Sequence, residues 1–148
     1  MKKLLLDSGI LSDFINRRRS VYDRVKEIAS QRVRIGTCVP VVAEIAFGIE
    51  ASKSREQNMQ RFLGALPSLT VWPFDQEAAF RYGLIAAALR RTGRPMQVVD
   101  IMVAAIALNL GDCSCSIFDS FFILPLYWIC FLNWFEVRKN WHGEIAIP

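Results

Sequence analysis

Three carboxylate residues of this chain stand in otherwise apolar segments. Asp7 directly follows three leucines, and Glu44 and Asp100 each interrupt a run of apolar residues. Burying an unpaired carboxylate is costly unless a partner compensates its charge. Any one of the three could instead be protonated or could cap a helix, but three in one small chain point to a shared divalent cation. Mg²⁺ is the preferred ion, because it accepts carboxylate oxygens together with water and phosphate oxygens, and Mn²⁺ would also fit.

The composition excludes several other kinds of chemistry. The only histidine, His142, is the seventh residue from the end of the sequence, which argues against a Ser-His-Asp triad or a His-rich zinc site in the body of the chain. With 148 residues, 53% of them hydrophobic, the chain suits one folded domain. The net charge of +4 is compatible with a polyanionic partner.

Strand and helix patterns alternate along the first 112 residues. Strands are expected at 3–6, 32–39 and 69–74, and helices at 10–15, 21–30, 40–50, 54–66, 76–91 and 98–110. Ser20 and Asp75 are the expected N-caps of the helices that follow them, and Gly93 is expected to end the helix 76–91. This alternation predicts an α/β sandwich with a short, mostly parallel sheet flanked by helices.

The expected elements would bring the three acids together. Asp7 lies at the carboxyl end of the first strand, where α/β sheets place their sites. Glu44 and Asp100 lie near the beginning of apolar helices that would pack on that sheet, where the helix dipole favours negative charge. The sequence therefore predicts one acidic site at this edge of the sheet.

At these residues the chain resembles PIN-domain ribonucleases of the VapC toxin type, over residues 3 to about 113 and more weakly to Asp119. The matching segments are Leu5–Ser12 for the opening strand with its D-[TS]-N element, Glu44–Gly48 for E-x-x-x-G, Gly93–Pro95 for the G-x-P turn and Asp100–Ala105 for D-x-x-[IL]-A-A. Ser8 matches the hydroxyl residue of the family, whereas Gly9 replaces the usual Asn.

The resemblance implies a metal-dependent endoribonuclease with the three-layer PIN fold. It implies Asp7, Glu44 and Asp100 as metal ligands, with Asp119 as the nearest candidate for a fourth catalytic acid and Ser8 in contact with the substrate. The products would carry 5′-phosphate and 3′-hydroxyl ends. By the same resemblance, the chain would be the toxin of a toxin–antitoxin pair, would form a homodimer and would be inhibited by a cognate VapB-like antitoxin.

Basic residues supply candidates for contacts to RNA phosphates, which fix position more than sequence. The candidates are Arg17, Arg90, Arg91 and Arg94. Each cluster could equally be a plain solvated surface. Because the sequence carries no evident secretory signal and no C-x-x-C spacing, we expect a cytoplasmic protein with free thiols.

The segment 113–148 departs from the family pattern and holds three of the four tryptophans and three of the four cysteines. Three explanations stay open: an irregular closure of the sheet, a translated frameshift, or a membrane anchor. The anchor is disfavoured, because the apolar run 121–132 has only 12 residues, whereas a helical span needs about 20. If this segment is altered, the alternative function is a catalytically impaired module that binds antitoxin or RNA.

Overall fold

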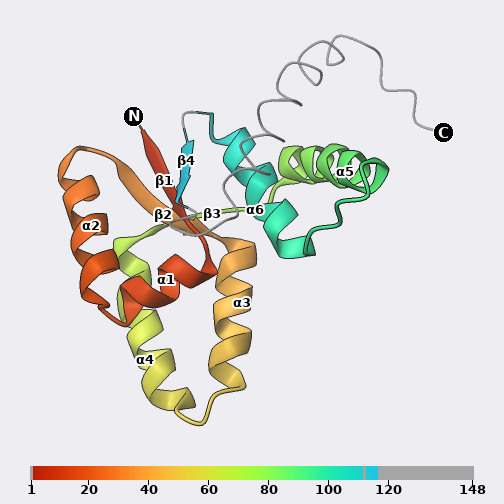
Figure 1. Ribbon diagram of the computed structural model, residues 1–148. Coiled ribbons are helices and arrows are strands. Elements are labelled where there is room, and N and C mark those ends of the chain that lie inside the picture. Colours follow the sequence, from red (N-terminus) through yellow and green to blue (C-terminus); the bar gives the residue numbers. More distant parts are fainter. Residues whose placement is uncertain (1, 112, 117–148) are drawn as a thin grey trace. The chain divides into compact units, whose positions relative to one another are not determined.

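A four-stranded parallel sheet organises the protein, as seen in a computed structural model (Figure 1). The structure describes residues 2–111 and the backbone of 113–116, all within one structural unit, 1–118. The elements in chain order are β1 (Lys3–Leu6), α1 (Ser8–Ile15), α2 (Arg19–Ser30), β2 (Arg34–Cys38), α3 (Val39–Glu50), α4 (Arg55–Ala65), the 3₁₀ turn η1 (Leu66–Ser68), β3 (Thr70–Trp72), α5 (Gln76–Arg91), α6 (Val98–Asn109) and β4 (Cys113–Ser116).

The strand order in the sheet is β3-β2-β1-β4, and every neighbouring pair is parallel. Leu4 of β1 lies opposite Ile35 of β2 on one side and Ser114 of β4 on the other. The prediction of an α/β fold with a parallel sheet flanked by helices is therefore confirmed. Strand β4 belongs to the segment 113–148, and its pairing with β1 makes β1 an inner strand.

The core forms where the inner strand meets the helices. Leu5 and Leu6 of β1 are almost completely buried, and so are Leu11 of α1, Val41 of α3 and Ile106 of α6. A parallel strand that is covered by helices on both faces buries every side chain, so its sequence is continuously apolar. This accounts for the three consecutive leucines. Since β1 is fixed on both edges and covered by helices, the residue that follows it is held in a defined position.

Local capping signals account for the boundaries of α5. Asp75 accepts a hydrogen bond from Ala78 N at 2.8 Å and so caps the helix, as predicted. At the other end Gly93 has a φ of +66°, and the Arg94 N–H bonds back to the Leu89 carbonyl at 3.0 Å. This is a Schellman ending, in which glycine takes the left-handed position without a Cβ penalty.

The prediction for the beginning of α2 was wrong. The helix begins at Arg19 rather than after Ser20, and Arg18 occupies the N-cap position without a side-chain hydrogen bond. Arg18 instead forms an ion pair with Asp13 at 3.1 Å. Tertiary packing of Val21, Val25 and Ile28 against the core stabilises this helix, so that the capping residue was a poor guide to where it begins.

Gly36 is required where β2 and β3 approach each other most closely. A Cβ at this position would lie 2.1 Å from the Thr70 carbonyl oxygen and 2.8 Å from the Trp72 ring. We expect Gly36→Ala to lower the free energy of unfolding by about 3 kcal/mol, because the strands would have to separate. Urea unfolding measures this change. Gly64→Ala is the matched control, because its Cβ would meet no atom within 4 Å, and an equal loss in both variants would contradict the close-approach argument.

Several predictions fall outside the described residues. Asp119 and the three explanations for the segment 113–148, apart from the strand pairing of β4, concern residues 117–148, which the structure does not describe. Within the part that it does describe, no helix is both long and apolar enough to cross a lipid bilayer.

Candidate active site

Asp7 stands at the junction of β1 and α1 and caps the helix. Its Oδ1 accepts a hydrogen bond from Ile10 N at 2.8 Å, and its carbonyl accepts one from Leu11 N at 2.8 Å. Capping was one of the plain explanations open for a lone carboxylate, and it applies to Asp7. The capping hydrogen bond uses only Oδ1 of Asp7, so it orients the carboxylate and leaves Oδ2 for another partner.

The electrostatic surroundings of Asp7 are acidic. Burial raises the pKa of Asp7 above its ordinary value of 3.8, and the Ile10 N–H offsets part of this increase. The carboxylates of Asp100, Glu44 and Asp13 raise the pKa further, because each disfavours a second negative charge nearby. The structure thus brings Asp7, Glu44 and Asp100, from β1–α1, α3 and α6, within electrostatic reach of one another.

No basic side chain neutralises these three acids within the described part of the chain. The ion pairs found there join Arg18 to Asp13, Arg55 to Glu50 and Arg81 to Glu77, and none of them involves Asp7, Glu44 or Asp100. Asp7 and Glu44 are half-buried, and Asp100 is exposed in the first turn of α6. Because no described basic side chain offsets the negative charge of these three acids, a bound cation would stabilise the fold.

The donor chemistry of this group suits a hard divalent ion, although the side chains do not form a closed cage. Among the described residues, no three Asp, Glu, Cys or His side chains lie close enough to enclose one metal ion. Mg²⁺ does not require such a cage, because it usually takes one or two carboxylates and completes its octahedron with water and substrate phosphate oxygens. The residues present therefore fit a partly hydrated Mg²⁺ ion.

The end of β2 supports the junction from beside it. The fully buried Thr37 hydroxyl donates to the Leu6 carbonyl at 3.0 Å, which ties β2 to the residue before Asp7. Cys38, the next residue, is a buried free thiol. Burial, and to a smaller extent the Glu44 carboxylate, raise its pKa to about 11. The thiol is therefore neutral at physiological pH, which excludes Cys38 as a nucleophile.

Ser8 and Gly9 follow Asp7 in the first turn of α1. Ser8 is half-buried and Gly9 is exposed. A Cβ at Gly9 would lie 3.9 Å from Asp7 Oδ1, an ordinary van der Waals distance. A larger residue would fit there, so that the replacement of Asn by Gly removes a polar side chain from beside the acidic group.

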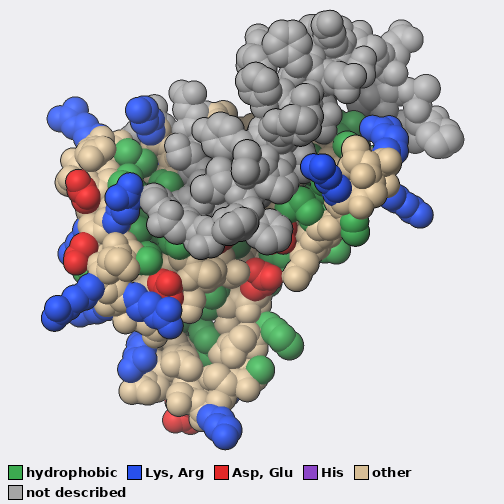
Figure 2. Space-filling model, in the orientation of Figure 1, with side chains coloured by type: hydrophobic (Ala, Val, Ile, Leu, Met, Phe, Trp, Pro, Cys, Tyr) green, Lys and Arg blue, Asp and Glu red, His purple; other side chains and the backbone are tan. Residues whose placement is uncertain are grey.

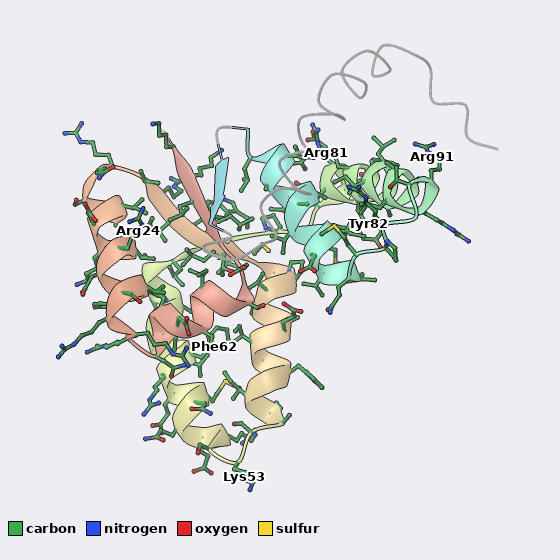
Figure 3. All side chains as sticks on the ribbon, viewed as in Figure 1. Arg24, Lys53, Phe62, Arg81, Tyr82 and Arg91 are labelled. Carbon is green, nitrogen blue, oxygen red and sulfur yellow. The ribbon has the colours of Figure 1, made fainter. Side chains whose placement is uncertain are left out.

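The predicted RNA-binding arginines are all exposed. Arg17 follows α1 and lies 5.9 Å from the centre of the Tyr22 ring. Arg90 and Arg91 lie in the last turn of α5, where their positive charges interact favourably with the helix dipole. Figure 3 shows Arg91 at the far end of that helix. Arg94 lies in the loop that leads to α6 and hence to Asp100. In Figure 2 Lys and Arg side chains lie over α2, α4 and α5, with few over α3.

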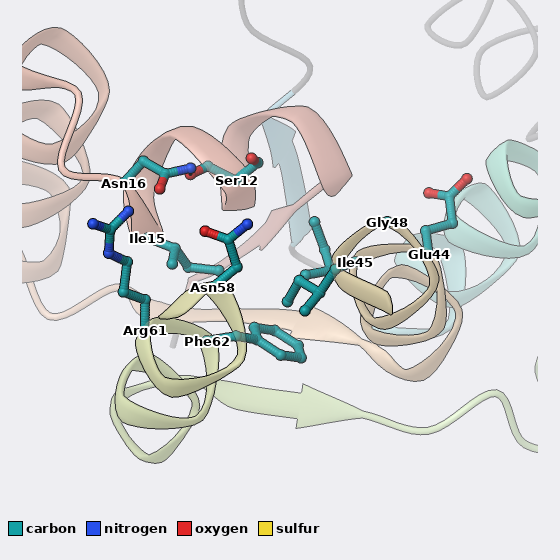
Figure 4. A pocket seen from close by; sticks show the side chains of 10 residues that line it. Ser12, Ile15, Asn16, Glu44, Ile45, Gly48, Asn58, Arg61 and Phe62 are labelled. Atoms are coloured by element: carbon teal, nitrogen blue, oxygen red, sulfur yellow. The ribbon is translucent and has the colours of Figure 1, made fainter. Parts of the chain in front are cut away.

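A polar pocket beside the acidic group had no signal in the sequence. It has a volume of about 300 Å³ and lies between α1, α3 and α4 (Figure 4). The polar residues in its lining are Ser12, Asn16, Glu44, Asn58 and Arg61. These residues are scattered through three helices and form no motif, so that only the packing of the helices brings them together.

Comparison with known proteins identifies the family of this chain. The PIN domain family model matches residues 4–113. The "tRNA(fMet)-specific endonuclease VapC" of Shigella flexneri is 32% identical over 114 residues, which cover 75% of this chain and 83% of that protein. "Ribonuclease VapC2" of Rickettsia felis is 27% identical over 104 residues, covering 70% of this chain and 78% of the relative.

Solved structures give the same family of folds. A DNA-bound VapBC complex from Salmonella typhimurium contains a chain with a TM-score of 0.68 and 27% identity, covering 76% of this chain and 83% of that one. VapBC2 from Rickettsia felis, bound to a DNA fragment from its promoter, gives a TM-score of 0.70 at 24% identity, covering 76% and 84%. The second of these likenesses concerns the fold alone.

Proposed function

Because the chain belongs to the PIN-domain family, among ribonucleases of the VapC type, we propose that it cleaves RNA internally with a divalent cation held at Asp7, Glu44 and Asp100. The observation that supports this proposal is the electrostatic proximity of three carboxylates from separate elements near the carboxyl end of β1, none of which pairs with a basic side chain within the described residues. Mg²⁺ is the proposed ion and Mn²⁺ the substitute. Asp119 stays a prediction for a fourth acidic position.

Each residue of the group has a distinct proposed task. Asp7 is oriented by its cap on α1 and offers Oδ2 to the cation, while Glu44 and Asp100 add negative charge that favours cation binding. When bound, the cation lowers the pKa of a coordinated water and stabilises the charge that develops on the phosphate. Ser8 contacts the RNA beside Asp7, and the exposed Arg17, Arg90, Arg91 and Arg94 bind phosphates along the strand.

The partners of this protein follow from the same family. VapBC structures pair a VapC chain with another protein, and we propose that this chain likewise binds a cognate VapB-like antitoxin that inhibits cleavage. We also propose a homodimer. The Shigella flexneri relative is named for its action on tRNA(fMet), which makes this RNA the first substrate to assay.

We expect the purified full-length chain to cut tRNA(fMet) or another RNA internally in the presence of Mg²⁺ or Mn²⁺. The new ends should be a 5′-phosphate and a 3′-hydroxyl, because water attacks the phosphorus and the 3′ oxygen leaves. Gel analysis with a 5′-phosphate-dependent exonuclease checks both points. RNA left intact by a protein that still binds RNA or an antitoxin would contradict catalysis and favour the impaired binding module.

A further inference from the structure

The pocket between α1, α3 and α4 has one acidic and one basic residue in its lining. Glu44 lies at one side of it, on α3, and Arg61 of α4 lies at the other (Figure 4). In this view the Glu44 side chain points toward α6, away from Ile45, which points into the pocket. Glu44 thus belongs both to the lining of the pocket and to the acidic group, with its carboxylate on the side of α3 that faces α6.

The polar groups of this pocket keep unused hydrogen-bonding capacity. Asn16 Nδ2 donates to the Ser12 carbonyl at 2.9 Å, and Asn58 Nδ2 donates to Ser52 Oγ at 3.1 Å. These bonds orient the two amides, and neither Oδ1 accepts a hydrogen bond from any residue within the described ranges. The exposed Arg61 guanidinium likewise forms no ion pair with a described residue.

The remaining walls of the pocket are apolar and firmly packed. Phe62 is 3% exposed and belongs to the core, and Ile15 and Ile45 pack against that core. Oriented acceptors beside apolar walls, with one exposed arginine in the lining, are the features with which proteins hold a nucleotide: hydrogen bonds read the base edge, apolar surface covers the ring, and arginine binds phosphate.

We propose that this pocket binds one nucleotide of the RNA next to the cleaved phosphodiester, an inference that rests on the proposed function. Arg61 contacts a neighbouring phosphate, and Asn16 and Asn58 accept hydrogen bonds from the exocyclic amino group of the base. The volume of about 300 Å³ is at the small end of ligand pockets. A groove for an antitoxin helix would instead be a long apolar surface with anchors at helical spacing, whereas half of this lining is polar.

The first experiment compares Arg61→Gln with Arg34→Gln in RNA cleavage by the full-length protein. Arg34 is also exposed and is the first residue of β2, outside the lining of the pocket, so the control removes the same charge away from the pocket. We expect Arg61→Gln to lower kcat/KM about 10-fold, mainly through KM, since a charge-assisted hydrogen bond to a phosphate is lost. Arg34→Gln should change it less than about 2-fold.

A second arm tests base recognition. In short single-stranded RNAs that differ at one nucleotide beside the cut, wild-type protein should prefer bases with an exocyclic amino group over uracil. Asn58→Ala should reduce this preference at that one position while cleavage elsewhere continues. A preference that is unchanged in Asn58→Ala would overturn the assignment of the amide.

A third arm does not depend on activity. Adenosine, cytidine and uridine 5′-monophosphates are titrated into the full-length protein in EDTA while the side-chain amide signals of Asn16 and Asn58 are followed by NMR. We expect both signals to shift with AMP or CMP, and less with UMP. The absence of any shift would overturn the proposal, as would an Arg61→Gln variant that cleaves RNA normally and has lost only antitoxin affinity. If wild-type protein cleaves no RNA, the proposed function fails, and the titration still decides whether the pocket takes a nucleotide.

Discussion

Replacing Asp7 by asparagine should abolish RNA cleavage and yet stabilise the metal-free protein. The expected loss in kcat/KM exceeds about 100-fold, because even the outer partners of metal ligands contribute 10–100-fold. Asparagine is as good an N-cap as aspartate, so that the hydrogen bond from Ile10 N is kept and α1 begins at the same residue. The substitution removes the negative charge and little else.

The stabilisation follows from the direction of the Asp7 pKa shift. Folding raises this pKa above its ordinary value of 3.8, through burial and the neighbouring carboxylates. The fold therefore favours the protonated form, and metal-free protein loses stability as the pH rises from below 3.8 through the raised pKa. Thermal unfolding in EDTA at neutral pH should give a higher Tm for Asp7→Asn than for wild type, and the difference should shrink on acidification.

Asp75→Asn is a matched control for this experiment. Asp75 caps α5 with the same Oδ1 to N–H distance of 2.8 Å that Asp7 shows at α1. The control should leave both cleavage and Tm nearly unchanged, since it keeps a cap outside the acidic group. An Asp7→Asn protein that still cleaves RNA at the wild-type rate would remove Asp7 from the site. A lower Tm would mean that the charge itself stabilises the fold.

Removal of divalent cations should stop cleavage completely. EDTA should reduce RNA hydrolysis by wild-type protein to the level of RNA alone, and added Mg²⁺ or Mn²⁺ should restore it, because residues 2–111 contain no histidine and their one cysteine, Cys38, has a raised pKa. Gel assays across a series of cation concentrations measure this dependence. Cleavage that persists in EDTA would exclude a metal-dependent mechanism.

The same cation should stabilise the fold in a way that depends on the acidic group. A ligand at 100 times its dissociation constant adds about 2.7 kcal/mol to the free energy of unfolding, so the Tm of wild-type protein should rise with Mg²⁺ at neutral pH. The rise should diminish in acid, where Asp7 becomes protonated, and should be much smaller in Asp7→Asn. Equal shifts in wild type and Asp7→Asn would place the bound cation elsewhere.

Local patterns were sufficient for much of the architecture. The apolar run before Asp7 indicated a buried strand, and Asp75 and Gly93 marked both ends of α5, because capping and left-handed endings depend on a few adjacent residues. The three acids were singled out by type alone, since an isolated carboxylate in an apolar segment is unfavourable wherever the chain goes. The tertiary structure then places Glu44 and Asp100 near enough to raise the pKa of Asp7, and their role as a cation site stays a prediction.

Tertiary structure decided what depends on contacts between distant segments. The beginning of α2 follows packing rather than Ser20, and the need for glycine at position 36 arises only because β3 lies against β2. The pocket containing Asn16, Asn58 and Arg61 has no motif, because its residues come from helices whose relative placement no local pattern encodes. The sequence by itself thus determined which carboxylates are unfavourable to bury. The packing of the helices on the sheet determined which of them lie close together.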